Sequence, residues 1–215
     1  MGAASKREEV FMQQLRCHDL KPGDVLLKVS DGSILSWGIQ FGQQAVGGKN
    51  AGIVHAGVLF DSTYMIEAQG AGISANDLRV QNLHYGYHVY RCRQKDLAEG
   101  AGTCAKMMFD IHQRGSNLKY SIGGAIGSLF GKGGRPAPAG DMDALLTRIL
   151  DGRRQGFFCS QFVVFVYQFV AEQNRLPATA LFNVNDAKVE PSELAARLQG
   201  HRFFEEIGYV MPDQR

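Results

Sequence analysis

Short apolar runs bounded by turn residues dominate the first 92 positions of the chain. Runs of this length predict β-strands rather than helices. The links between them are short, and Asp61-Ser62 suits a hairpin turn. We therefore expect an antiparallel sheet. Its strands are predicted at residues 25–29, 54–60, 64–68 and 87–92.

Apolar side chains recur with helical spacing in other parts of the chain. One such pattern predicts a helix within the N-terminal segment 1–19. Asp141 is a favourable N-cap residue, and Pro191 suits the first turn of a helix. The expected helices span residues 5–16, 33–44, 94–112, 141–150 and 158–172, with a last helix from Pro191 and a closing strand at 202–207.

These elements predict a single α+β domain over residues 1–215, with a small antiparallel sheet packed against helices. Apolar residues make up 45% of the chain, which is enough for a core without disulfides or metals. Residues 115–140 contain eight glycines and two prolines. We expect a long loop there, which is a candidate lid over a site.

Charge and apolar content argue against two classes of partner. The formal net charge is +2, and the basic residues are scattered rather than gathered in a stripe, so we expect no nucleic-acid partner. The most apolar stretch, residues 157–171, is interrupted by polar residues. It is also shorter than the roughly 20 residues that a membrane-spanning helix needs. We therefore expect no transmembrane segment.

The four cysteines and the N-terminal residues bear on the compartment. No two cysteines have the CxxC spacing of a redox or zinc motif. The N-terminus is charged and lacks the apolar run of a signal peptide. We expect the protein to be made in a reducing cytoplasm with free thiols.

Two further patterns superficially suggest binding sites. Gly131-Lys132-Gly133 lacks the Ser or Thr of a phosphate-binding loop. His84 and His88 have a spacing seen in zinc sites, but the pattern supplies no cysteine or acidic partner. The sequence therefore predicts neither a metal nor a cofactor.

Cys159 stands where a turn containing Gly156 runs into a long apolar helix. The free N–H groups and the positive dipole end of such a helix stabilise a thiolate, which is the nucleophilic form of cysteine. The alternative is a structural thiol, because free cysteine is among the most buried residue types. The position by itself leaves both interpretations open.

His55 lies near the start of one predicted strand, and Glu67 lies on the next. A hairpin turning at Asp61-Ser62 places residue 55 opposite residue 68, which makes His55 and Glu67 near neighbours. A carboxylate on an apolar strand needs a partner, because burying it unpaired is costly. An imidazole is a suitable partner. The alternative is a structural His–Glu pair at a sheet edge.

The order of these segments resembles a known family. Gly23-Asp24 precedes a strand, and His55-Ala56-Gly57-Val58-Leu59 is followed by Ile66-Glu67-Ala68. Cys159-Ser160-Gln161 then begins a late helix, and residues 189–194 follow that helix. This arrangement resembles the circularly permuted NlpC-type papain-like cysteine hydrolases, including the YiiX-like amidases and peptidases. In that family the histidine strand precedes the cysteine helix.

The resemblance implies a role for each candidate residue. Cys159 would be the nucleophile, His55 the general base and acid, and Glu67 the residue that orients His55. The backbone N–H of Cys159 would be one oxyanion donor, with Tyr120 or Gln161 as candidates for the second. Asp24 would have a mainly structural role. The chain departs from the family in its glycine-rich segment 115–140, which leaves the substrate open.

The resemblance also favours a substrate, an amide of bacterial cell-wall peptides. Without an export signal, the enzyme would either recycle wall fragments in the cytoplasm or be delivered by a secretion system to a target-cell periplasm. The type VI effectors of this fold are an example of such delivery, and an effector would have a cognate immunity protein. Other hypotheses are a lipid-directed acyltransferase or lipase, a protein deamidase, and a non-catalytic binding module.

Overall fold

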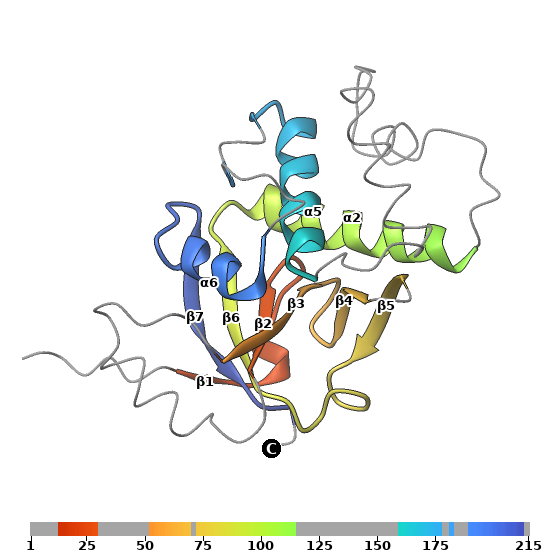
Figure 1. The fold of residues 1–215 in the computed structure, drawn as a ribbon, viewed down its shortest axis with the longest axis vertical. Coiled ribbons are helices and arrows are strands. Elements are labelled where there is room, and N and C mark those ends of the chain that lie inside the picture. Colours follow the sequence, from red (N-terminus) through yellow and green to blue (C-terminus); the bar gives the residue numbers. More distant parts are fainter. Residues whose placement is uncertain are drawn as a thin grey trace, which may run out of the picture.

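A seven-stranded mixed β-sheet forms the centre of the part of the chain that the computed structural model describes (Figure 1). That part comprises residues 13–29, 52–69, 72–114, 159–177, 181–182 and 189–212. The strands are β1 (Gln14–Leu15), β2 (Val25–Val29), β3 (Ile53–Leu59), β4 (Tyr64–Gln69), β5 (Gly72–Asp77), β6 (Tyr87–Cys92) and β7 (Phe204–Val210). Their order across the sheet is β1-β7-β6-β2-β3-β4-β5.

Three α-helices accompany the sheet in the described residues, which makes the fold α+β. They are α2 (Lys95–Gln113), α5 (Cys159–Gln173) and α6 (Pro191–Gln199). A short 3-10 helix, η1 (Cys17–Asp19), follows β1. Apart from the N-terminal helix, the strands and helices predicted in these segments are confirmed to within a few residues at their ends. The helices predicted at 33–44 and 141–150 and the loop predicted at 115–140 lie outside the described residues.

The predicted N-terminal helix is wrong where it can be checked. Gln14–Leu15 forms β1, which pairs in parallel with Tyr209–Val210 of β7. Pairing buries Leu15, whereas an isolated helix would leave its apolar face unsupported. All other strand pairs are antiparallel. The sheet is therefore mixed rather than purely antiparallel.

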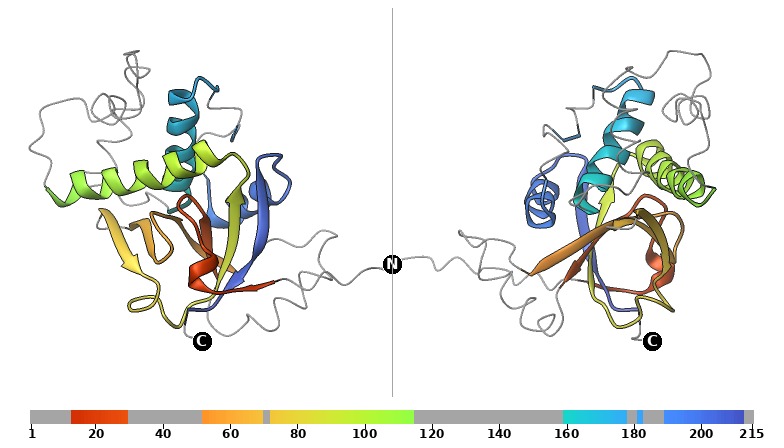
Figure 2. Two further views of the ribbon diagram at one scale, coloured as in Figure 1. Left: turned by 180° about the vertical axis from the view of Figure 1, so that it is seen from behind. Right: turned by 45° about the vertical axis from the view of Figure 1, so that its right-hand side comes forward.

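The helices cover one face of a curled sheet (Figure 2). Alternate residues of β2, β3, β4, β5 and β6 pack with α2 and α5 to form the larger apolar core. Nearly every residue of α5 is buried, which explains why its sequence is apolar on all sides. None of the described helices is both long and apolar enough to span a membrane. The other face of the sheet holds a smaller core around Leu26, Leu59 and Met65.

The turn before β2 joins the sheet to both large helices. Gly23 has φ +83°, and a Cβ atom there would lie 2.0 Å from the carbonyl oxygen of Ala98 in α2. Its own carbonyl accepts a hydrogen bond from the Tyr167 hydroxyl of α5. Glycine at this position therefore permits both the left-handed backbone and the close approach of α2.

Asp24 anchors the same turn through Arg91 of β6. The Nε and Nη2 atoms of Arg91 donate to the two carboxylate oxygens of Asp24 at 2.8 and 2.6 Å. The backbone N–H of Lys21 donates a third hydrogen bond at 2.8 Å. Burial raises the pKa of Asp24, while the hydrogen bonds from Arg91 and Lys21 oppose that rise. These contacts fix the start of β2 relative to β6.

Candidate active site

Cys159 is the first residue of α5. Its side chain lines a pocket and is only 5% exposed. The remainder of α5 is held in the core, so the position of this thiol is set by the packing of the whole helix. The backbone N–H groups of the first helical turn have no acceptor within the helix. An anion beside Cys159 would therefore find donors and a favourable dipole.

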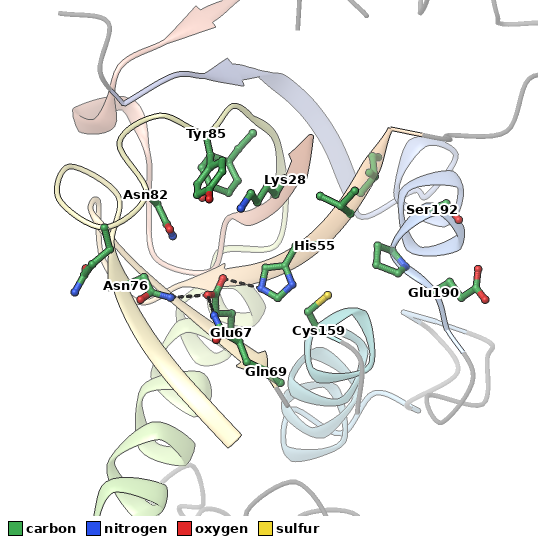
Figure 3. A pocket seen from close by; sticks show the side chains of 16 residues that line it. Lys28, His55, Glu67, Gln69, Asn76, Asn82, Tyr85, Cys159, Glu190 and Ser192 are labelled. Atoms are coloured by element: carbon green, nitrogen blue, oxygen red, sulfur yellow. Dashed lines mark hydrogen bonds and ion pairs between the residues drawn. The ribbon is translucent and has the colours of Figure 1, made fainter. Parts of the chain in front are cut away.

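His55 on β3 contacts Glu67 on β4 directly. Its Nε2 atom lies 2.8 Å from Oε2 of the carboxylate (Figure 3). The side chain of His55 is 21% exposed, whereas that of Glu67 is 4% exposed. Because Nε2 is occupied by Glu67, Nδ1 is the ring nitrogen left for the thiol. The side chain of Cys159 lies beside this imidazole in Figure 3.

The hairpin register differs by one residue from the register expected from the sequence. Val58 pairs with Ile66 and Leu59 with Met65, so His55 falls opposite Gln69 and not opposite residue 68. The difference matters because side chains alternate between the faces of a strand. In the observed register His55 and Glu67 share a face; in the expected one they would not. No further β3–β4 pair forms between the described residues toward His55.

The Glu67 carboxylate receives two further hydrogen bonds on its other oxygen. Gln69 Nε2 and Asn76 Nδ2 both donate to Oε1, the latter at 2.5 Å. Gln69 lies two residues further along β4, and Asn76 lies on β5. Neither residue was predicted, and β5 itself was not. The signal that was available is the polar residue at Gln69, two positions after Glu67 and therefore on the same face.

The environment of His55 favours its protonated form. Burial alone would lower the pKa of His55, because it disfavours the charged imidazolium. Hydrogen bonds and negative charge from Cys159 and Glu67 outweigh burial and raise this pKa from 6.5 to about 9. An imidazolium at neutral pH is a suitable partner for a thiolate.

The pocket around these residues has a volume of about 900 Å³, and both polar and apolar side chains line it (Figure 3). Two strands contribute polar side chains that the sequence analysis missed: Lys28 of β2 and Tyr87 of β6. Lys28 is the one charged residue in an otherwise apolar strand, and this contrast was a signal of function. Gln81, Asn82 and Tyr85 line the same side of the pocket.

The opposite rim of the pocket is the start of α6. Glu190, Pro191 and Ser192 line it. The hydroxyl of Ser160 donates a hydrogen bond to the carbonyl of Val189, so the residue after Cys159 holds this rim in place. The segment 189–194, noted in the sequence for its position after the cysteine helix, thus borders the candidate site.

The other residues that the sequence analysis considered as site candidates do not line the pocket within the described part of the chain. Gln161 is buried in α5 and is not among the residues lining the pocket, and Tyr120 lies outside the described residues. His88 lies 2.7 Å from Glu206 through its Nδ1 atom. Among the described residues, no group of three or more His, Cys, Asp or Glu side chains could hold a metal ion.

The three remaining cysteines are free but lie in other environments. Burial raises the pKa of Cys104 far above its usual range and also raises the pKa of Cys92. Burial raises the pKa of Cys17 as well, against a smaller opposing effect of Arg79. These thiols therefore provide internal references for the reactivity of Cys159.

Comparison with known proteins assigns neither a family nor a function to the chain. No protein-family model matches the chain, and no curated protein sequence matches it. The chemistry of the site therefore has to be inferred from its geometry. A thiol at a helix start, an imidazole beside it and a buried carboxylate holding that imidazole are the parts that nucleophilic acyl transfer requires.

Proposed function

We propose that this protein is a cysteine hydrolase that cleaves amide bonds, with Cys159 as nucleophile, His55 as base and acid, and Glu67 as orienting residue. The observation that carries the proposal is the 2.8 Å contact between Nε2 of His55 and Glu67, which leaves the other ring nitrogen for Cys159. A purely structural His–Glu pair would have no need of a pocket and a thiol at the start of a helix beside it.

In the proposed reaction, the Cys159 thiolate attacks the carbonyl carbon of the substrate. The backbone N–H of Cys159 stabilises the resulting oxyanion. When the C–N bond breaks, the imidazolium of His55 transfers its Nδ1 proton to the departing amine and leaves a thioester. Neutral His55 then takes a proton from water, which attacks the thioester. Cleavage of the C–S bond releases the acid and restores the thiolate and imidazolium.

The chain order supports a permuted papain-like fold as the family of this proposal. The strand of the base (β3) and the strand of the orienting acid (β4) precede the nucleophile helix (α5) in sequence. That helix packs on the sheet, and its first residue lies at the pocket. This order is the one that the NlpC-type resemblance implies.

The lining of the pocket favours a polar acyl donor over a lipid. An acyl chain in the pocket would desolvate polar side chains such as Lys28 and Asn82 without offering them a hydrogen bond, which is costly. A peptide offers carbonyl and N–H groups to pair with them. We therefore propose amides of cell-wall peptides, rather than lipid esters, as the substrate class. Delivery as a secreted effector is part of the same hypothesis.

The proposal is tested first at the thiol. Purified protein is treated with iodoacetamide between pH 5 and pH 10, and the modified cysteine is located by mass spectrometry. We expect Cys159 to react near neutral pH about 10-fold faster than free cysteine, because an ion-paired thiolate is already formed there. His55→Ala should abolish this advantage. His18→Ala, which removes an exposed histidine, serves as the control and should leave the rate unchanged. A Cys159 that reacts no faster than free cysteine would contradict the proposal.

Substrate class is tested next, with Cys159→Ser as the inactive control. Peptide hydrolysis releases new amines from peptidoglycan fragments. Lipase activity releases fatty acid from phospholipid vesicles, and deamidation converts a protein glutamine into glutamate without cleavage. New amines whose release depends on Cys159 would support the amidase. Release of fatty acid instead would indicate a lipase, and formation of glutamate without cleavage would indicate a deamidase.

A further inference from the structure

Lys28 lines the pocket, and no carboxylate of the described residues pairs with it. Its side chain is half-buried, and its Cα pairs with that of His55 across β2 and β3. The Nζ atom lies 2.9 Å from the centroid of the Tyr85 ring, and no residue of the described chain forms an ion pair with it. Figure 3 shows Lys28 directed toward Tyr85 at the wall of the pocket. A partly buried cation of this kind attracts an anion from outside the chain.

Tyr87 is a second polar group without a partner at the same wall. The residue is 1% exposed, yet its hydroxyl accepts and donates no hydrogen bond among the described residues. It lines the pocket, and its Cα pairs with that of Lys28 across β2 and β6. Buried hydroxyls are almost always hydrogen-bonded, so an unpaired one in a pocket indicates a missing ligand.

Lys28 and Tyr87 belong to one row of side chains that begins at His55. The three residues occupy successive strands at paired positions and therefore project from the same face of the sheet. Neighbouring strands lie about 5 Å apart, so Lys28 is about 5 Å and Tyr87 about 10 Å along the sheet from the base. At these distances, the side chains of Lys28 and Tyr87 could reach a substrate group that lies one residue away from the scissile bond.

We propose that Lys28 and Tyr87 form a subsite that binds a free carboxylate of the substrate, one residue away from the bond attacked by Cys159. The inference rests on the proposed hydrolase function and narrows its substrate to acyl amides or peptides that carry an acidic group near the cleaved bond. Lys28 supplies the charge and Tyr87 a hydrogen bond to the same group.

The other charges of the pocket favour a carboxylate over a phosphate. Glu67 is engaged by three hydrogen bonds, and Glu190 on the opposite rim points away from the pocket in Figure 3. A single ammonium group balances a carboxylate, whereas a phosphate dianion would keep an unbalanced charge near two glutamates.

A pair of alkylating probes tests the subsite. N-iodoacetylglycine and N-iodoacetylglycinamide carry the same electrophile, and only the first has a carboxylate one residue beyond the reacting carbon. We expect Cys159 to prefer the anionic probe about 10-fold over the neutral one, relative to free cysteine, because a charged hydrogen-bonded contact is gained. Lys28→Met should remove most of this preference. The preference is a ratio of two rates at the same thiol, so a change in the reactivity of Cys159 that affects both probes equally does not alter it.

Matched variants separate the subsite from general electrostatics. Lys28→Arg should retain part of the preference, and Lys95→Met, which removes an exposed cation on α2, should leave it intact. Tyr87→Phe should lower it about threefold, as expected for the loss of one hydrogen bond. Circular dichroism confirms that each variant is folded before rates are compared.

The outcomes distinguish the two proposals. Fast reaction of Cys159 with both probes and no preference that depends on Lys28 would overturn the subsite and leave the hydrolase standing. Slow reaction with the neutral probe would count against the hydrolase. The subsite is then tested by NMR titration of Cys159→Ser with N-acetylglycine and N-acetylglycinamide. Selective binding of the acid that Lys28→Met abolishes supports it, and equal or absent binding overturns it.

Discussion

Asn76 and His55 contact opposite oxygens of the same carboxylate. Asn76 Nδ2 donates to Oε1 of Glu67 at 2.5 Å, and His55 Nε2 lies 2.8 Å from Oε2. One oxygen is thus fixed to β5 and the other orients the imidazole. The direction of the His55 ring depends on a strand that carries none of the three proposed catalytic residues.

Removing this support should slow catalysis without preventing folding. We expect Asn76→Ala to reduce the alkylation rate of Cys159 at neutral pH about threefold, since the base loses part of its orientation. Glu67→Gln should cause a larger loss, of about 10-fold, because the imidazolium loses its negative partner. Asn174→Ala, at the far end of the α5 segment, serves as the control. Equal rates in Asn76→Ala and the wild type would contradict the role of β5.

The raised pKa of His55 predicts the alkaline limit of activity. Since this pKa is about 9, the imidazolium is present at neutral pH and is lost as the pH rises through that value. We expect kcat/KM for an amide to fall above about pH 9, because the departing amine no longer receives a proton.

An NMR titration of the His55 ring checks the cause of that limit. Cys159→Ser should lower the pKa of His55, because hydrogen bonding and negative charge from Cys159 help to raise it. The same titration of Glu67→Gln should also move the pKa down. A pKa that stays near 6.5 in all three proteins would show that no ion pair forms.

Asp24→Asn should destabilise the protein without changing the chemistry of the site. Asp24 is 1% exposed and accepts two hydrogen bonds from Arg91, so the amide leaves a partly buried guanidinium unneutralised. We expect the free energy of unfolding to fall by about 3 kcal/mol in urea denaturation. Glu205→Gln breaks an exposed pair with Arg93 and should cost less than about 1 kcal/mol. Similar losses in both variants would contradict the anchoring role of Asp24.

Two buried tyrosines of β6 should respond differently to loss of their hydroxyl groups. The Tyr90 hydroxyl donates to Glu206 at 3.1 Å, so Tyr90→Phe should lower the free energy of unfolding by about 1 kcal/mol. The Tyr87 hydroxyl is unpaired among the described residues, so Tyr87→Phe should leave the stability unchanged or increase it. Thermal unfolding of both variants provides the measurement. A clear loss in Tyr87→Phe would show that the hydroxyl already has a partner.

The sequence predicted the strands and helices that carry the site, because their apolar patterns are strong and continuous. It also placed His55 and Glu67 on neighbouring strands. It could not set their register, since a hairpin with Asp61-Ser62 admits turns that differ by one residue. That single residue decides whether the two side chains share a face.

What the sequence missed depends on contacts between distant segments. β5 has mixed polar and apolar residues that resemble a loop, and its pairing with β4 makes it a strand. β1 is two residues long and exists because it pairs with β7. The roles of Lys28 and Tyr87 follow from the order β6-β2-β3, which places residues far apart in the chain on adjacent strands.

The division of the site between sheet and helix has a consequence for folding. β3, β4 and β5 hold the proposed base and the residues that support it, whereas the proposed nucleophile comes from α5, which lies much later in the sequence. In the proposed mechanism, the thiol is activated only after α5 has docked on the sheet. A newly synthesised or partly unfolded chain would carry a cysteine of ordinary reactivity. Labelling of Cys159 during refolding would time the last step of assembly.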